Sequence, residues 1–355
     1  MGTAVRPAPN AFVRIARKAY HPLGFSKGYN FVLFFIFFFT LLIFSLVSSP
    51  KINYNTFCME DGEISGACFW YEKIPLHKVA IIMHLAGILP AGVLVCFQFV
   101  PVLRHKVILF HRINGYLVIA LSLVGGIGGV IISRHAFGGG LDAQAFTGIA
   151  TIMFLGSMLI AIVNIKRLQI EQHRAWMLRA WFYASSIITT RIIMITGVSI
   201  ITYSGYHTSR SCEEVAFSMR DQNRTLELFP DCAAYFTGED LEKWVAVSAR
   251  FAANARDGIE VQAVLGLMFG PACWLALALH AIGIEIYLHL TPVEHERLRQ
   301  VSYQRQVKAG MRHPGSAGLT ADRLGDAAKW SPRDDDLDGT EMDGSSSASL
   351  PTTNR

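Results

Sequence analysis

Four histidines stand near the ends of long apolar stretches, where an imidazole could act as a metal ligand. They are His84, His111, His135 and His173. A neutral ring nitrogen can bind iron in an apolar site, and two axial imidazoles from neighbouring helices are what a six-coordinate b-type haem requires. The path of the chain therefore decides which of these histidines can meet.

The composition indicates an integral membrane protein. Of the 355 residues, 52% are hydrophobic. Several apolar runs have the length of about 20 residues that a helix needs to cross a hydrocarbon core of ~30 Å, and a helix satisfies its own backbone hydrogen bonds in lipid. We therefore predict an all-α fold, a polytopic membrane helical bundle with about six transmembrane helices. The net charge of +5 fits basic residues at the cytosolic ends of the spans, so we predict the lipid bilayer as a partner and no nucleic acid.

The apolar runs divide the chain into segments. The basic start lacks the apolar core of a signal peptide, so the first run is predicted to be an uncleaved anchor. The last segment is charged and then rich in Asp, Gly and Ser, which is typical of disorder. The predicted segments are a cytosolic segment at 1–28, a first transmembrane anchor at 29–50, an outer loop at 51–78, a helical membrane domain at 79–290 with a long outer loop at 205–260, and a disordered cytosolic tail at 291–355.

Three features agree on a topology with both termini in the cytosol. The two short loops placed inside, 104–112 and 166–179, are basic for their length. The N-glycosylation sequon at Asn223 falls outside. Four loop cysteines also fall outside, in an oxidising compartment: Cys58, Cys68, Cys212 and Cys232. We predict disulfides among them, within or between the two loops, in a protein of the plasma membrane or the secretory pathway.

This topology sorts the histidines into two pairs. His84 and His135 lie near the outer face and His111 and His173 near the inner face, since the 24 residues from His111 to His135 span about 36 Å of helix. Two haems at these levels would form an electron path across the membrane. The angular positions are less favourable, because 24 residues at about 100° each leave His111 and His135 about 120° apart. Structural or proton-handling histidines are therefore the alternative, and His280 in the sixth span could replace one of the four.

Two more polar residues lie within the spans. Arg191 is near mid-depth in the fifth span, where an unpaired charge costs several kcal/mol and functional residues concentrate. We expect it to bind a haem propionate, an anionic substrate or an acidic side chain, with hydrogen bonds to carbonyls as the structural alternative. Glu285 lies near the inner end of the last span, too far inward to pair directly with Arg191. With His280 it forms an alternative polar site, although it could equally extend to the interface.

Short motifs surround the histidines. His84 opens His-Leu-Ala-Gly, His111 opens His-Arg-x-x-Gly-Tyr, and His173 opens His-Arg-x-Trp-Met. These motifs resemble those of a family of predicted multi-pass membrane proteins of unknown function, classified as a DUF domain. The resemblance covers roughly 79–290 and implies a membrane bundle without naming an activity. A looser similarity to diheme transmembrane cytochromes concerns only the placement of the histidines.

Three hypotheses about function follow. The first is a haem-binding protein that transfers electrons across the membrane, with haem b at two bis-His sites and Arg191 as a propionate or substrate partner. The second is a non-redox carrier of a small molecule or ion, with a cavity lined by Arg191, His84 and His280. The third is an accessory or scaffold protein of the membrane. The sequence contains no His-Glu-x-x-His zinc motif and no Gly-x-Ser-x-Gly nucleophile elbow, so we assign no catalytic residue and no metal beyond a haem iron.

Overall fold

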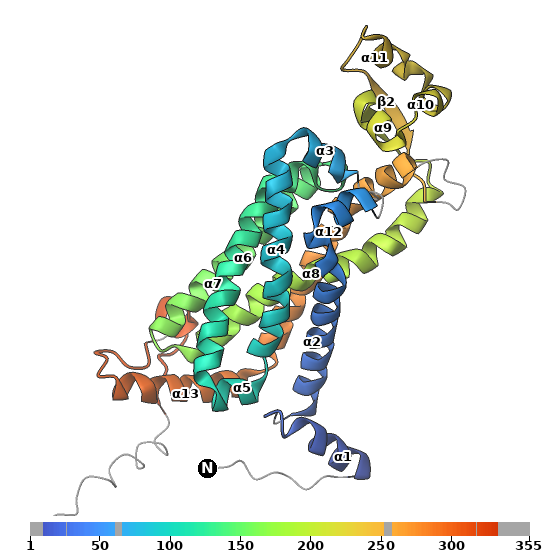
Figure 1. Ribbon diagram of the computed structural model, residues 1–355. Helices are drawn as coiled ribbons and strands as arrows, with labels where there is room; N and C mark the ends of the chain where they lie inside the picture. The colour runs from blue at the N-terminus through green and yellow to red at the C-terminus, as the bar shows by residue number, and fades with distance from the viewer. Residues whose placement is uncertain (1–9, 26, 61–65, 252–257, 317, 333–355) are drawn as a thin grey trace, which may run out of the picture. The chain divides into compact units, whose positions relative to one another are not determined.

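Long helices dominate the structure, a computed structural model that describes residues 10–25, 27–60, 66–251, 258–316 and 318–332 (Figure 1). Among these residues, six helices are long and apolar enough to cross a membrane. The prediction of an all-α polytopic bundle with six spans is confirmed. The six helices are α2 (Gly28–Ser48), α4 (Pro75–Gln98), α6 (Ile108–Ile132), α7 (Leu141–Lys166), α8 (Ile170–Thr202) and α12 (Gly258–His289).

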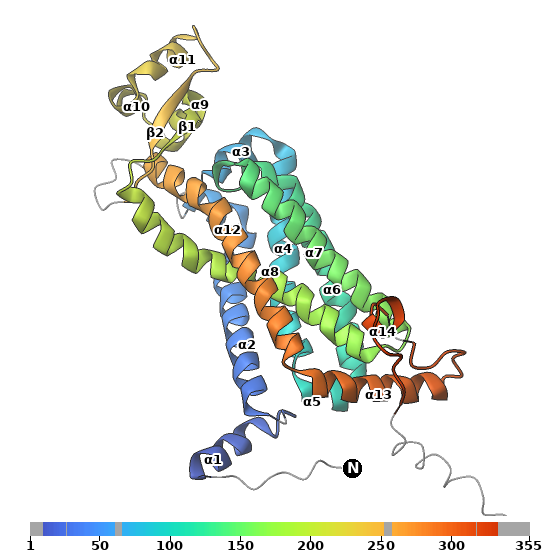
Figure 2. The same ribbon diagram turned by 180° about the vertical axis from the view of Figure 1, so that it is seen from behind.

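The other elements are short. They are α1 (Ala11–Tyr20), η1 (Ser49–Ile52), η2 (Thr56–Glu60), α3 (Ala67–Lys73), α5 (Pro101–Lys106), η3 (Ser133–Gly138), β1 (His207–Ser211), α9 (Cys212–Met219), α10 (Gln222–Leu228), η4 (Pro230–Cys232), α11 (Ala233–Thr237), β2 (Trp244–Ser248), α13 (Pro292–Lys308) and α14 (Ala321–Leu324). The chain divides into two compact units, which are described separately. Unit 1 contains Met1–Leu155 and Trp181–Ala281, and unit 2 contains Gly156–Ala180 and Ile282–Arg355. Helices α7, α8 and α12 each contain residues of both units, and all three are labelled in Figure 2.

Helices α4 and α6 of unit 1 pack backbone against backbone through glycines. A Cβ atom on Gly87 of α4 would lie 2.5 Å from the nitrogen of Gly125 and 2.6 Å from the carbonyl oxygen of Leu121. A Cβ atom on Gly128 of α6 would lie 2.7 Å from the backbone nitrogen of His84. Small residues allow membrane helices to approach this closely. The register between α4 and α6 is therefore set by backbone contact.

The disulfides of unit 1 close local loops. The bonded pairs are Cys58–Cys68 and Cys212–Cys232. This outcome confirms the predicted disulfides and selects pairing within each loop over pairing between loops. The second disulfide lies in the segment 205–251, which we call the β segment because strands β1 and β2 pair antiparallel in it. Asn223 is exposed on α10 of this segment, and its glycosylation, like the orientation of the termini, stays a prediction.

In unit 2 the chain continues after α12 as helix α13, which has a proline in its first turn. The hydroxyl of Ser302 donates to the carboxylate of Glu171 at 2.5 Å. The side-chain amide of Gln306 donates to the carbonyl oxygen of Arg167 at 3.0 Å. The predicted disorder of the tail therefore does not apply to α13, because its polar side chains find buried partners at the turn between α7 and α8.

The chain beyond α13 returns to this helix. Arg299 donates to the carboxylate of Asp322 at 2.5 Å, and its guanidinium lies 4.7 Å from the ring centroid of Trp330. The hydrogen bond from Arg299 lowers the pKa of Asp322 to about 2. The indole N–H of Trp330 donates to Glu296 at 3.0 Å. The structure thus differs from the expected disorder as far as residue 332, and the rest of the predicted tail, 333–355, lies outside the described residues.

Replacing Gly128 with leucine is expected to lower the thermal unfolding midpoint of the detergent-solubilised protein, because the new side chain would meet the backbone of α4. Overpacking of this kind costs about 1–3 kcal/mol. Gly148→Leu on α7 is the matched control, since a Cβ atom there meets nothing within 4 Å. Equal midpoints for the two variants would show that the α4–α6 contact does not support the fold.

Candidate functional site

His84 lies in the contact between α4 and α6. Its Nδ1 atom is 2.7 Å from the carbonyl oxygen of Gly125. A carbonyl only accepts, so Nδ1 carries the proton and donates, and Nε2 keeps the lone pair. A Cβ atom on Gly129 would lie 2.9 Å from the same Nδ1. The glycines of α6 therefore make room for the imidazole and fix its tautomer.

His135 lies in η3 and has a different neighbour from the predicted one. Its ring stacks on Trp70 of α3, with centroids 3.9 Å apart and an interplanar angle of 15°. The ring of His77, on α4, is 5.1 Å away, centroid to centroid. His77 precedes His84 by seven residues, which is about 10 Å along a helix. The structure thus places His135 at the level of His77, about two turns from His84, and iron binding by either predicted ligand stays a prediction.

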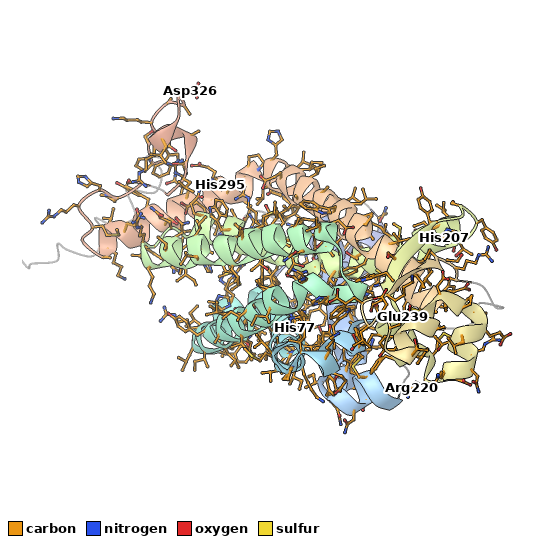
Figure 3. All side chains as sticks on the ribbon, turned by 90° about the horizontal axis from the view of Figure 1, so that it is seen from above. His77, His207, Arg220, Glu239, His295 and Asp326 are labelled. Atoms are coloured by element: carbon orange, nitrogen blue, oxygen red, sulfur yellow. A yellow bond between two sulfur atoms is a disulfide. The ribbon has the colours of Figure 1, made fainter. Side chains whose placement is uncertain are left out.

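His77 was missed because the second span was predicted to begin at residue 79. Helix α4 begins earlier, at Pro75, since proline is favoured in the first turn of a helix. The dipeptide Ile74-Pro75 is a sequence signal that could have extended the span to include His77. Figure 3 labels His77 on the membrane helices, apart from His207 on the β segment.

The two histidines predicted near the inner face belong to different units. His111 is in the first turn of α6, in unit 1, where its carbonyl oxygen accepts a hydrogen bond of 3.1 Å from Gln98. His173 is in α8, in unit 2, and its Nδ1 lies 3.0 Å from the carbonyl oxygen of Ala161 on α7. By the same argument as for His84, this Nδ1 donates and Nε2 keeps the lone pair. The pairing of His111 with His173 stays a prediction.

Arg191 of α8 contacts an aromatic side chain within unit 1. Its guanidinium lies 4.8 Å from the ring centroid of Phe137, which in turn stacks on Phe269 of α12 at 4.3 Å. Phe137 has a φ of 53°, a left-handed conformation that is rare for residues other than glycine. Arg191 also lies 3.9 Å from the sulfur of Met194. Within the part of the chain that the structure describes, Arg191 has no carboxylate partner, so most of its donors are available to an anion.

His280 uses both of its ring nitrogens within unit 1. Nδ1 donates to the carbonyl oxygen of Phe182 at 2.7 Å, so Nε2 accepts from the hydroxyl of Thr189 at 2.8 Å. In unit 2, Glu285 accepts two hydrogen bonds from Arg179, at 2.6 and 2.9 Å. The alternative polar site is therefore divided, because His280 bridges α12 to α8 while Glu285 forms a bidentate ion pair.

A buried ion pair in the β segment holds the end of η3. Arg210 lies 3.1 Å from Glu214, and both side chains are buried. The same Nη1 atom of Arg210 donates to the carbonyl oxygen of Gly138 at 2.8 Å. Burial raises the pKa of Glu214 to about 7, against the attraction of Arg210. The polar composition of this loop does not indicate a buried ion pair, although Ser211 is a recognisable N-cap for the helix that presents Glu214.

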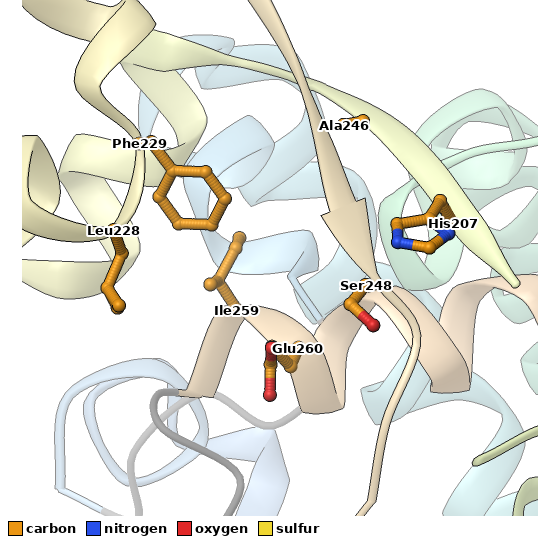
Figure 4. Close-up of a pocket in the computed structure, with 7 residues that line it drawn as sticks. All are labelled: His207, Leu228, Phe229, Ala246, Ser248, Ile259 and Glu260. Carbon is orange, nitrogen blue, oxygen red and sulfur yellow. The ribbon is translucent and has the colours of Figure 1, made fainter. Parts of the chain in front are cut away.

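The β segment and the start of α12 also line a half-open pocket of about 190 Å³ (Figure 4). None of the four predicted haem ligands lines it. The imidazole of His207 donates to the carbonyl oxygen of Gly205 at 3.0 Å at its edge. The lining residues are His207, Leu228, Phe229, Ala246, Ser248, Ile259 and Glu260.

Comparison with known proteins identifies one family. Residues 81–215 match the family model described as "Predicted membrane protein (DUF2306)". This match confirms the predicted resemblance over a stretch that contains all four predicted haem ligands and Arg191, and excludes His77 and His280. The description assigns no activity. No curated protein matches the chain, and no solved structure matches it.

Replacing Glu214 with glutamine is expected to remove a pH dependence of stability. The carboxyl group titrates near 4.5 when exposed and near 7 when buried. The folded chain therefore holds the proton more tightly, so the free energy of unfolding falls as pH rises from about 4.5 to about 7. Thermal midpoints measured across this range should fall in the parent and stay flatter in Glu214→Gln. Glu227→Gln, at an exposed position of the β segment, should behave like the parent, and an equal slope in Glu214→Gln would contradict the assignment.

Proposed function

We propose that the chain is an integral membrane protein that binds b-type haem within its helical bundle and carries electrons. We assign His84 and His173 as axial ligands of separate haems. The observation that supports this assignment is shared by both residues, namely that Nδ1 donates to a backbone carbonyl of a neighbouring helix. Metal-bound histidines almost always donate their second ring N–H to such a group, which fixes the orientation of the ring and its tautomer.

The charge within unit 1 also fits a haem. Haem carries propionate groups, and Arg191 is a cation in a membrane-spanning helix without a carboxylate partner in the described residues. Its contact with Phe137 stabilises the cation by only about 0.5–2 kcal/mol. A propionate would supply the missing negative charge through a charge-assisted hydrogen bond. When bound, haem supplies reversible one-electron chemistry, and the protein tunes it through the axial histidines and their hydrogen bonds.

Two of the other candidate histidines fit this role less well. Both ring nitrogens of His280 are already hydrogen-bonded, so ligation would require the loss of the bond to Thr189. His135 lies at the level of His77 and about two turns from His84, so we do not include it among the ligands. The non-redox carrier remains the alternative hypothesis, and it predicts a protein without haem.

The visible spectrum of the full-length protein, expressed with added haem and purified in detergent, tests this proposal. We expect a Soret band, with sharper α and β bands after reduction. His84→Ala and His173→Ala should each lower the haem content, because each removes an axial ligand. His280→Gln should leave the spectrum unchanged, since that side chain already has two partners. A colourless parent protein, or full haem content in both alanine variants, would rule out the assignment.

A further inference from the structure

We propose that His77 and His135 form a separate metal site at the disulfide-bonded end of unit 1, and that this site binds copper. The two imidazoles come from different elements, α4 and η3, and lie 5.1 Å apart between ring centroids. Nitrogen ligands bind such ions at about 2.0–2.1 Å. The centroid separation is therefore within reach of two imidazole nitrogens bound to one ion.

The polar atoms of this cluster lack partners in the protein. Among the described residues, the buried Nδ1 atoms of His77 and His135 and the buried Nε1 atom of Trp70 make no hydrogen bond. Buried polar atoms nearly always have a partner, and an exception calls for an explanation such as an ion or an ordered water. The indole N–H of Trp70 is only a donor, so the two imidazole nitrogens are the atoms of this cluster that can bind a metal.

The surroundings hold the cluster in place. The Trp70 indole covers one face of His135 at 3.9 Å. The Cys58–Cys68 disulfide packs with Tyr71, which follows Trp70 in the chain, and with Ile81, which lies one helical turn after His77. Helix α3, which carries Trp70, is thus tied by a covalent bond, and the imidazoles are preorganised by rigid elements.

Copper is the ion that this donor set favours. Imidazole nitrogen suits copper, zinc, iron and nickel, and of these metals copper is the one that proteins commonly bind as a singly charged ion. Within the described residues, no group of three or more His, Cys, Asp or Glu side chains could hold a metal, so the four protein ligands of a structural zinc site are missing. Two neutral imidazoles bring no negative charge, and Lys73 lies 5.8 Å from the Trp70 ring. A singly charged ion, Cu(I), is therefore tolerated better than a divalent one.

This site does not depend on the haem assignment. His135 is not among the haem ligands proposed above, and His77 lies outside the residues that match the family model. The copper measurement and the haem spectrum can therefore fail independently. An ordered water shared by the three side chains is the competing explanation, and it predicts no affinity for copper.

Titration of the copper-free full-length protein in detergent with Cu(I), in competition with the chelator bicinchoninate, tests the proposal. We expect one tightly bound copper ion per chain. His77→Gln and His135→Gln should each weaken binding by more than about tenfold, since each removes one of two ligands. His207→Gln, which changes a histidine of the β segment outside this cluster, is the matched control and should bind like the parent. No competition by the parent, or parent-like binding by both glutamine variants, would overturn the proposal.

Tryptophan fluorescence gives a second measurement that does not need a histidine variant to fold. Copper bound between His77 and His135 should quench Trp70, which is in ring contact with His135. Trp70→Phe keeps an aromatic ring in place, so it should still bind copper while losing part of the quenching. Unchanged quenching in Trp70→Phe would place the copper elsewhere and overturn the proposal.

Discussion

The backbone contact between α4 and α6 determines where the histidines of unit 1 lie. Gly87 faces Gly125, and Gly128 lies against the backbone of His84. A shift of α6 by one helical turn would bring at least one side chain, such as that of Leu121 or Ile132, to a position now held by a glycine, where the spacing between the helices leaves no room. The observed register brings the imidazole of His84 to the carbonyl of Gly125 and places His77 beside His135. The glycines at this contact therefore determine where the histidines of unit 1 lie relative to their polar neighbours.

Hydropathy predicts most of the architecture, because the cost of leaving backbone groups unpaired in lipid applies to every span alike. The same argument places residues by depth. Glu285 was expected to lie too far inward for Arg191, and the structure pairs it with Arg179. However, the depth of a residue in the membrane does not determine which residues of other helices it contacts. His84 and His135 share a predicted face of the membrane, yet about two turns separate their levels.

The features that the sequence analysis missed depend on contacts between distant segments. His77 was assigned to a loop because the charged Lys78 follows it. Hydropathy alone does not detect the polar first turn of a helix, which here begins at Pro75. Arg210 and Glu214 were part of a polar loop in the sequence, although in the structure both are buried. Helix α13 has a polar composition that is typical of disorder, and it is ordered by partners more than 100 residues away. A polar composition shows that a segment favours water. It does not show that the folded protein will provide buried hydrogen-bond partners for the segment's side chains.

The hydrogen bond between Ser302 and Glu171 is one of those that join α13 to the turn between α7 and α8, and it leaves no room for a larger group. Ser302 is the donor, the carboxylate of Glu171 is the acceptor, and both are almost inaccessible to solvent. A phosphoryl group on this serine would bring two more negative charges against a carboxylate without room for water between them. Helix and turn would then have to separate, which would also break the bond between Gln306 and Arg167. A covalent modification at this position would therefore weaken the contact between α13 and this turn.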